Sequence, residues 1–318
     1  MISAISLAVV FYFADVGEMI RAMSQANYLI VAAATGISLL WLLVRAIAWR
    51  TLLQEKASFS QVFFTLNEGY LLNNILPFRL GEVGRAFLLG QKANLGFWQV
   101  FSTILIERAL DLALAAGLLF STLPFVVGAT WARQAAVAAA IVVMAGLGGL
   151  YLLARHRIWA IAQFNRLAGH WPVLQKLGGG RLTAFFNGLA ILTDTGRFLR
   201  AVSWMVVDWG IAIFQYYVLL LAFFPQGKLL WAAFSLGVGA LGIAAPSSPG
   251  ALGVLEASLV GALSLFGLDS STALVFALTA HLLNYLTTGV LGAYALARDG
   301  ETLSGVYQRI RKIPQPDI

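Results

Sequence analysis

The chain contains no cysteine among its 318 residues, and only 11% of its residues are charged. The absence of cysteine excludes disulfide bonds, thiolate catalysis and cysteine-ligated metal sites. The scarcity of charge excludes an ordinary soluble domain, in which about a quarter of the residues are charged. Hydrophobic residues make up 60% of the chain, so the composition indicates an integral membrane protein.

Acidic residues are also fewer than basic ones, with 14 Asp and Glu against 21 Lys and Arg. The basic residues lie mostly between or beside long apolar runs, which fits loops facing anionic lipid better than nucleic-acid binding. Several runs exceed the roughly 20 residues that a helix needs to cross a bilayer. We therefore predict an all-α, polytopic bundle of transmembrane helices in the cell membrane, with no nucleic-acid partner.

The distribution of basic residues predicts a topology. Residues 1–14 lack a basic n-region, so they do not read as a signal peptide, and they are short for a span. The positive-inside rule predicts six crossings, two helical hairpins that enter from opposite sides, and two cytoplasmic termini. Full-length spans are predicted at residues 28–53, 97–123, 131–154, 201–224 and 271–297.

The chain reads as one membrane domain, residues 1–318, with a first half at about 1–154 and a second at about 201–297. Between them, residues 155–200 form a basic, aromatic linker, and residues 298–318 form a basic tail. The linker is expected to hold an amphipathic helix on the membrane surface, or to serve as a mechanical elbow between the halves. The apolar face of this helix consists of Leu182, Phe185, Phe186, Leu189 and Leu192.

A polar stretch at residues 73–85, reading N-N-I-L-P-F-R-L-G-E-V-G-R, interrupts the apolar sequence. Pro77 disfavours a helical conformation before it, so one helix should end within residues 73–76 and another should start at Pro77. Residues 59–95 then form a hairpin that enters from the cytoplasmic side. A complete crossing at residues 59–76 is the alternative.

The second helix of this hairpin would carry a charged stripe. Arg79, Glu82 and Arg85 follow one another at i, i+3 spacing and would share one face. Gly81 and Gly84 would let another backbone approach closely. The alternative is a cytoplasmic loop whose charges are simply solvated.

The predicted span at residues 97–123 contains three further charges. Each charge at mid-membrane costs about 2.5 to 3.5 kcal/mol, so Glu107, Arg108 and Asp111 must point into the bundle and find partners. Arg108 and Asp111 are spaced for an ion pair within the helix, which leaves a surplus of acid. A structural salt bridge that fixes helix packing is the alternative to a binding role.

The second half contains a similar interruption at residues 245–250, reading A-P-S-S-P-G, within an apolar stretch at 229–266. Two prolines and a glycine cannot continue a helix, so a second hairpin is expected. Pro77, Gly81 and Glu82 have counterparts in Pro249, Gly253 and Glu256. Broken helices at corresponding positions of two halves are typical of an inverted repeat around a transporter's binding site, with helix N-termini available to anions such as phosphate.

Three motifs now identify a resemblance that covers nearly the whole chain. They are N-x-x-L-P-x-R-x-G-E-x-x-R at residues 73–85, E-R-x-x-D at 107–111, and P-S-S-P-G-x-x-G-x-x-E at 246–256. They resemble the lysylphosphatidylglycerol synthase transmembrane-region family, a flippase-like group. The resemblance implies a region that moves aminoacylated phosphatidylglycerol between leaflets, while a separate soluble domain performs aminoacyl transfer. Because no such domain is recognised here, we expect no enzymatic activity.

The resemblance and the charge pattern select the same candidate residues for binding a lipid headgroup. We expect arginines to take the phosphate and acidic residues to accept from headgroup hydroxyls or amines, with no catalytic residue, metal or cofactor. The binding residues are Arg79, Glu82, Arg85, Glu107, Arg108, Asp111, Pro249, Gly250, Gly253 and Glu256. Asn73, Asn74, His281 and Asn284 are expected on the wall of the same pocket, which should lie near the middle of the membrane where the two breaks converge.

Three functions compete for this pattern. The leading hypothesis is a translocase for a phospholipid or lipid-linked molecule with a polar or cationic headgroup. A membrane-embedded transferase with a lipid-linked donor is the second, although the sequence shows no Asp-x-Asp metal motif and His281 stands alone. A non-catalytic partner of a separately encoded lipid-modifying enzyme is the third, and a homodimer is compatible with each.

Overall fold

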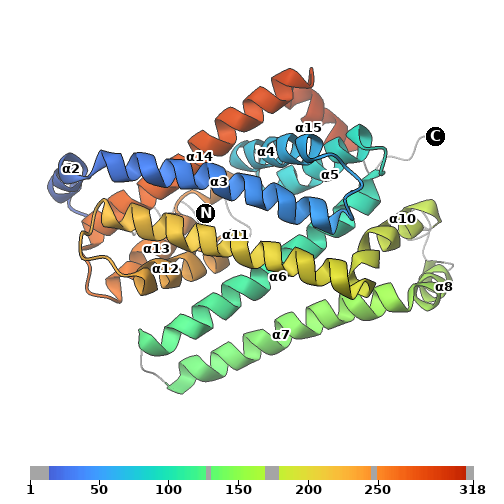
Figure 1. Ribbon diagram of the computed structural model, residues 1–318, viewed down its shortest axis with the longest axis horizontal. Helices are drawn as coiled ribbons and strands as arrows, with labels where there is room; N and C mark the ends of the chain where they lie inside the picture. Colours follow the sequence, from blue (N-terminus) through green and yellow to red (C-terminus); the bar gives the residue numbers. More distant parts are fainter. Residues whose placement is uncertain (1–13, 127–129, 169–178, 245–248, 313–318) are drawn as a thin grey trace.

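The computed structural model describes residues 14–126, 130–168, 179–244 and 249–312. Throughout these residues the secondary structure is helical, without a strand, as predicted (Figure 1). The first part of the chain contains α2 (Val16–Gln25), α3 (Tyr28–Leu52), α4 (Phe59–Ile75), α5 (Leu80–Lys92), α6 (Phe97–Thr122), η1 (Leu123–Phe125), α7 (Thr130–Arg155) and α8 (Arg157–Ala168). The second part contains α10 (Gly180–Leu189), η2 (Ala190–Thr193), α11 (Thr195–Leu221), α12 (Leu229–Gly242), η3 (Pro249–Ala251), α13 (Val254–Ser264), α14 (Ser270–Arg298) and α15 (Leu303–Lys312).

Long helices occupy the predicted spans. Three described helices, α3, α11 and α14, are long and apolar enough to cross a membrane. Helix α6 is also long enough, with 26 residues. It differs from these three helices because its middle contains three charged residues, Glu107, Arg108 and Asp111. Helix α11 begins at Thr195, within the predicted linker, because Asp194 caps it by accepting a hydrogen bond from the Arg197 amide at 3.1 Å.

The first helix break lies where Pro77 predicts it, but the second helix starts later than expected. Helix α4 ends at Ile75, and α5 starts only at Leu80. Phe78 and Arg79 between them take left-handed backbone angles, with φ of 56° and 54°. The prediction of a helix starting at Pro77 was therefore wrong, and Arg79 precedes α5 instead of lying on its charged face.

Helices α4 and α5 pack side by side as a hairpin. The Gln61 side chain donates to the Lys92 carbonyl at 2.8 Å, which joins the open ends of the pair. At the closed end, a Cβ atom on Gly81 would lie 2.1 Å from the Gly69 carbonyl oxygen. The close approach predicted at Gly81 is thus confirmed.

The two halves of the chain pack in a matching pattern. Helices α12 and α13 form the second helix pair, and residues 245–248, with Pro246, lie outside the described residues. Helix α3 packs along α11 (Figure 1), α4 packs on α14, and α12 packs on α6. Suppose that α3, α4, α5 and α6 correspond in order to α11, α12, α13 and α14. The contact of α3 with α11 then maps onto itself, and the contact of α4 with α14 maps onto that of α12 with α6.

The linker contacts the protein more closely than the sequence suggests. Helix α10 packs on α6, and a Cβ atom on Gly188 would lie 1.8 Å from Ser102 Oγ. Phe186 and Leu189 are buried in the hydrophobic core that α10 shares with α6. The apolar face predicted to lie on the membrane instead packs against the bundle, which favours the elbow alternative.

The tail also folds back on the bundle. Helix α15 packs on α5, and Val306 is fully buried against Leu72, Leu88 and Leu296. The tail was predicted only to be basic, although Leu303, Val306, Tyr307 and Ile310 follow the spacing of an amphipathic helix.

We predict that Gly81→Ala destabilises the hairpin, because the added methyl group would overlap the Gly69 carbonyl oxygen. Overpacking of this kind costs about 1 to 3 kcal/mol. Thermal unfolding in detergent should show a lower Tm. Gly36→Ala is the matched control, since no atom lies within 4 Å of its Cβ position. Equal Tm values for the two variants would contradict the close contact.

Candidate functional site

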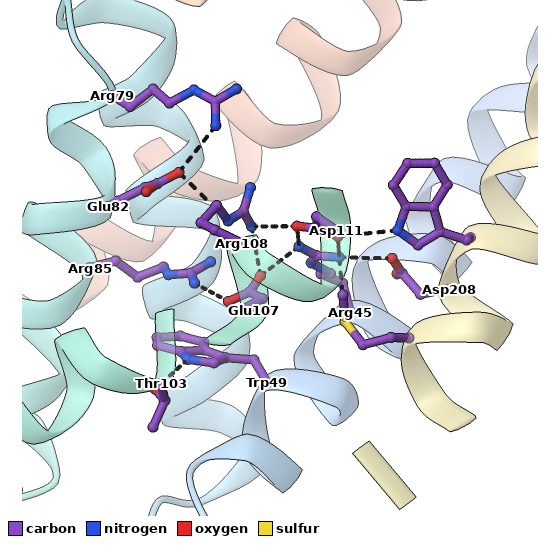
Figure 2. A network of polar contacts seen from close by, with 12 residues as sticks. Arg45, Trp49, Arg79, Glu82, Arg85, Thr103, Glu107, Arg108, Asp111 and Asp208 are labelled. Atoms are coloured by element: carbon purple, nitrogen blue, oxygen red, sulfur yellow. Dashed lines mark hydrogen bonds and ion pairs between the residues drawn. The ribbon is translucent and has the colours of Figure 1, made fainter. Parts of the chain in front are cut away.

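Arg45 of α3 stands at the centre of a buried charge network (Figure 2). Its guanidinium contacts Asp111 at 2.8 and 2.5 Å and Glu107 at 2.7 Å, both on α6, and Asp208 of α11 at 3.1 Å. Trp209 Nε1 also donates to Asp111 at 3.1 Å. The Arg45 side chain is only 4% exposed. One guanidinium therefore ties together three long helices from both halves of the chain.

Glu107 is the second buried hub of the network. Its carboxylate is fully buried and accepts from Arg108 at 2.8 Å, in addition to contacting Arg45 and Arg85. The Arg85 guanidinium lies over the Trp49 ring, 4.1 Å from its centroid, so one face of the cation meets an aromatic ring. Three guanidinium groups thus surround one carboxylate, which satisfies the requirement that a buried charge be paired.

The network extends outwards to the first helix break. Arg108 contacts Asp111 at 3.1 Å and Glu82 at 3.7 Å, and Glu82 contacts Arg79 at 3.6 Å (Figure 2). The Arg79 side chain is 39% exposed, and that of Glu82 is 19% exposed. The site therefore has a closed inner end at Arg45 and a partly open outer end at Arg79.

The charges of the network balance. The positive members are Arg45, Arg79, Arg85 and Arg108, and the negative members are Glu82, Glu107, Asp111 and Asp208. The predicted ion pair of Arg108 with Asp111 is confirmed, while the predicted surplus of acid is wrong. Arg45 supplies the missing positive charge, and burial of the whole set is less costly because it is neutral.

Several donors of the network still lack a hydrogen-bond acceptor. The Nε atoms of Arg45, Arg85 and Arg108 are buried without a hydrogen-bond partner, and so is Asp208 Oδ1. Unsatisfied buried donors are costly. The carboxylates of the network thus leave one donor of each of these three arginines unbonded.

Arg79 connects the two helix breaks. Its Nη2 donates to the carbonyl of Ile243, the C-cap residue that follows α12, at 2.6 Å. Asn73 Oδ1 accepts from the Gly81 amide at 2.8 Å, and Asn74 donates to Thr288 of α14 at 3.1 Å. The asparagines expected on a pocket wall therefore fasten the first break and the contact of α4 with α14.

The second break has its own polar cluster. His281 Nδ1 lies 2.5 Å from Glu256 Oε1, and its Nε2 lies 2.9 Å from the Gly250 carbonyl oxygen. The Gly253 amide donates to Glu256 Oε2 at 2.7 Å. His281, which stood alone in the sequence, thus has two partners, and only the three-dimensional structure reveals them.

The contacts of the described residues divide the predicted site into two clusters. One cluster surrounds Arg45 and Glu107, and the other surrounds Glu256 and His281, with Pro249 and Gly250 in the adjoining η3 turn. The hydrogen bond from Arg79 to the Ile243 carbonyl joins the first cluster to the end of α12. Asn284, predicted on the pocket wall, has an exposed side chain on α14.

Sequence reasoning missed the partners that lie far away along the chain. Arg45 was interpreted as a topology signal at the cytoplasmic end of its span, and Asp208 was not assigned to the site. The sequence did contain a signal for these partners, because a charged side chain within one apolar span needs an oppositely charged partner in another span. Lys92 was missed in the same way; it contacts the buried Glu68 at 2.6 Å and also Asp299.

The fold and the site define a class: an integral membrane helix bundle that buries a neutral network of arginines and carboxylates beside a broken helix. The chain belongs to the lysylphosphatidylglycerol synthase transmembrane-region family, whose model matches residues 1–292. The resemblance seen in the three sequence motifs is thereby confirmed.

Two curated relatives are similar to the chain. Glycosyltransferase AglD of Haloferax volcanii is 29% identical over 124 residues, which are 37% of this chain and only 19% of that protein. A UPF0104 membrane protein of Methanocaldococcus jannaschii is 27% identical over 223 residues, which are 70% of this chain and 91% of that protein. No solved structure matches the chain.

We predict that Arg45→Met destabilises the protein strongly, because it leaves the buried carboxylates of Glu107, Asp111 and Asp208 without their shared cation. Breaking a buried ion pair typically costs about 3 to 5 kcal/mol. Adding Asp208→Asn to Arg45→Met should restore part of the Tm, since it removes one unpaired charge.

Arg21→Met is the matched control for this prediction. Arg21 pairs with Glu18, but its side chain is 64% exposed, so its loss should cost less than about 1 kcal/mol. Similar Tm losses for Arg45→Met and Arg21→Met would show that the network does not hold the helices together.

Proposed function

We propose that this protein is a flippase-like translocase, which moves a phospholipid or lipid-linked molecule with a polar or cationic headgroup between leaflets. One observation carries the proposal: the buried arginine–carboxylate network opens at the first helix break and reaches the second through Arg79. Intramembrane ionisable residues of this kind mark substrate pathways.

The outer end of the network suits a lipid headgroup. A guanidinium group binds phosphate through two parallel hydrogen bonds, and Arg79 is the most exposed cation of the network. A bound phosphate would compete with the Ile243 carbonyl for Arg79, and so would loosen the contact between the two breaks. Glu82 and Asp111 would accept hydrogen bonds from headgroup amines or hydroxyls.

The lengths of the helices support hairpins that enter the membrane without crossing it. Helix α4 has 17 residues and α5 has 13, which correspond to about 25 and 20 Å. Helices α12 and α13 have 14 and 11 residues, or about 21 and 17 Å. Each is shorter than the roughly 30 Å hydrocarbon core, so we infer two re-entrant hairpins.

The matching contacts of the two halves support an inverted repeat. In such repeats the hairpins enter from opposite sides and the substrate site lies between them near the midplane. We infer that both termini lie in the cytoplasm, because the positive-inside rule assigns the loops and the tail that are rich in Lys and Arg to that side. Rocking of one half against the other, along the contact of α3 with α11, would expose the site to each leaflet in turn.

A membrane-embedded transferase is the second candidate, and one observation favours it. The Haloferax volcanii relative is named a glycosyltransferase, although the similarity covers only 19% of that protein. Among the described residues no group of His, Asp and Glu is arranged to hold a metal ion. A protein that supplies lipid to a separate enzyme is the third candidate, and product formation by the purified protein alone would favour the transferase.

We predict that purified protein in liposomes moves fluorescent phosphatidylglycerol or lysylphosphatidylglycerol between leaflets, measured by chemical quenching of the outer leaflet. Arg79→Gln and Glu82→Gln should each reduce the rate at least about tenfold, the effect of losing about 1.4 kcal/mol of binding. Both side chains are partly exposed, so folding should survive the changes.

Arg79→Lys and Arg21→Gln are the controls. Lysine keeps the charge but not the paired hydrogen bonds, so Arg79→Lys should retain an intermediate rate. Arg21→Gln, on exposed α2, should retain the full rate. Wild-type rates in Arg79→Gln and Glu82→Gln would remove the outer end of the network from the transport pathway.

A further inference from the structure

The pair of Glu256 and His281 lies outside the arginine network and has an unusual arrangement of acceptors. His281 Nδ1 faces a carboxylate oxygen of Glu256 at 2.5 Å, while its Nε2 faces the carbonyl oxygen of Gly250 at 2.9 Å. The other oxygen of Glu256 is occupied by the Gly253 amide. Both ring nitrogens of the histidine therefore point at oxygen acceptors.

Hydrogen bonds at both ring nitrogens require a definite number of protons. They need an imidazolium beside a carboxylate, or a neutral ring that donates from Nε2 and accepts at Nδ1 from a protonated Glu256. Either way, the pair carries two protons. With one proton removed, a nitrogen lone pair must face one of the two oxygens, so one hydrogen bond is lost.

Electrostatics decide which bond is lost. A hydrogen bond to an ionised carboxylate is stronger than a bond to a neutral carbonyl. The remaining proton therefore stays on Nδ1, against Glu256, and the Nε2 lone pair repels the Gly250 carbonyl. Protonation of the pair and attachment of the η3 turn to α14 are thus linked.

We propose that Glu256 and His281 form a proton-binding site whose occupancy controls the docking of the η3 turn on α14. At low pH the pair holds both protons and the turn is docked. As the pH rises, one proton leaves to water, His281 becomes neutral beside the Glu256 carboxylate, and Gly250 is released. No other reactant takes part in this step.

The η3 turn lies close against α14 beside the bond from His281 to Gly250. Gly250 and Ala251 both have left-handed backbone angles, with φ of 62° and 60°. A Cβ atom on Gly250 would lie 1.4 Å from the hydroxyl oxygen of Tyr285, whose ring stacks on His281 at 4.6 Å between centroids. The buried Tyr285 hydroxyl has no hydrogen-bond partner, so it does not hold the turn in place of His281.

The titratable side chains near the pair are two tyrosines. Helix α14 contributes Tyr285, and α11 contributes Tyr216, whose ring packs on Phe276 of α14. Helix α12 and the η3 turn carry no titratable side chain. On α4, which packs on η3, Asn74 is neutral and Glu68 is paired with Lys92. The cation that reaches the end of α12 is Arg79, and it bonds to Ile243.

The position of the pair connects the proton to the proposed transport site. Arg79 holds Ile243 on one side of the second helix interruption, and His281 holds Gly250 on the other. Release of Gly250 would loosen the interruption and with it the acceptor of Arg79. This last step, coupling of lipid movement to a proton, rests on the proposed function, whereas docking of the turn does not.

The docking step can be followed with a spin label at position 252. The natural chain has no cysteine, so Leu252→Cys, a position that is 45% exposed beside the turn, gives a single labelling site. Between about pH 5 and about pH 9, a range that spans ordinary histidine titration, the ratio of mobile to immobile label should rise about tenfold. A tenfold change corresponds to losing one charge-assisted hydrogen bond whose free energy is at the lower end of the usual range.

Two matched variants separate proton binding from general loosening. In Glu256→Gln, the amide can donate to Nδ1 while Nε2 keeps its hydrogen on Gly250, so the label should stay immobile across the range. In His281→Gln, the mobility should not change with pH. A pH response in either variant equal to that of the labelled parent would overturn the proposal.

A direct view of the protons needs no variant in the pair. Histidine labelled with ¹⁵N gives signals from His156, His170 and His281, and substituting the first two assigns the signal of His281. The Nε2 hydrogen of His281 should disappear in the same pH range in which the label becomes mobile. Retention of that hydrogen while the label becomes mobile would overturn the link.

Transport measured on the same samples distinguishes the two proposals. A pH-dependent docking transition without lipid movement at any pH would contradict the translocase and leave the proton site in place. Lipid movement without a docking transition would contradict the proton site and leave the translocase in place. If both proposals hold, the wild-type transport rate should change in the pH range of the docking transition. The transport rate of Glu256→Gln should not change in that range. A Glu256→Gln rate with the same pH dependence as the wild type would overturn the coupling.

Discussion

The structure depends on the cost of placing charge where water cannot solvate it. Glu107 and Arg45 are almost completely buried, and such groups persist only when opposite charges and donors surround them. Because Arg45 contacts carboxylates on α6 and α11, the requirement for neutrality also fixes how the two halves meet. The same network that holds the helices together extends to Arg79, its most exposed cation, so stability and the proposed binding role share one set of residues.

A second constraint comes from the two interrupted helices. An interruption frees backbone groups that lipid cannot satisfy, so each must be bonded by the protein. At the first break, Asn73 accepts from Gly81; at the second, Arg79 and His281 donate to the carbonyls of Ile243 and Gly250. In the proposals above, Arg79 can exchange its backbone acceptor for a phosphate, and His281 can lose a proton. Either change would break a hydrogen bond at the second break and allow the proposed movement.

Local sequence rules predicted the features that one segment determines. Pro77 marked the first break, and the charges on α6 had to face inwards because no isolated charge is stable in lipid. The start of α5 was not predicted, since Phe78 and Arg79 take left-handed angles and Arg79 bonds to Ile243, which is far away along the chain. The Arg45 partner Asp208 is 163 residues away along the chain, and no local pattern joins them. The pairing of Glu256 with His281 was hidden for the same reason.

Retention of lipid through native mass spectrometry tests most directly whether the arginine network binds a lipid phosphate. The protein would be offered phosphatidylglycerol and diacylglycerol with identical acyl chains, which differ only in the phosphate headgroup. The account predicts that the wild type retains phosphatidylglycerol in preference to diacylglycerol, and that Arg79→Gln with Arg108→Gln abolishes the preference. Equal retention of the two lipids by the wild type, or an unchanged preference in the double variant, would contradict it.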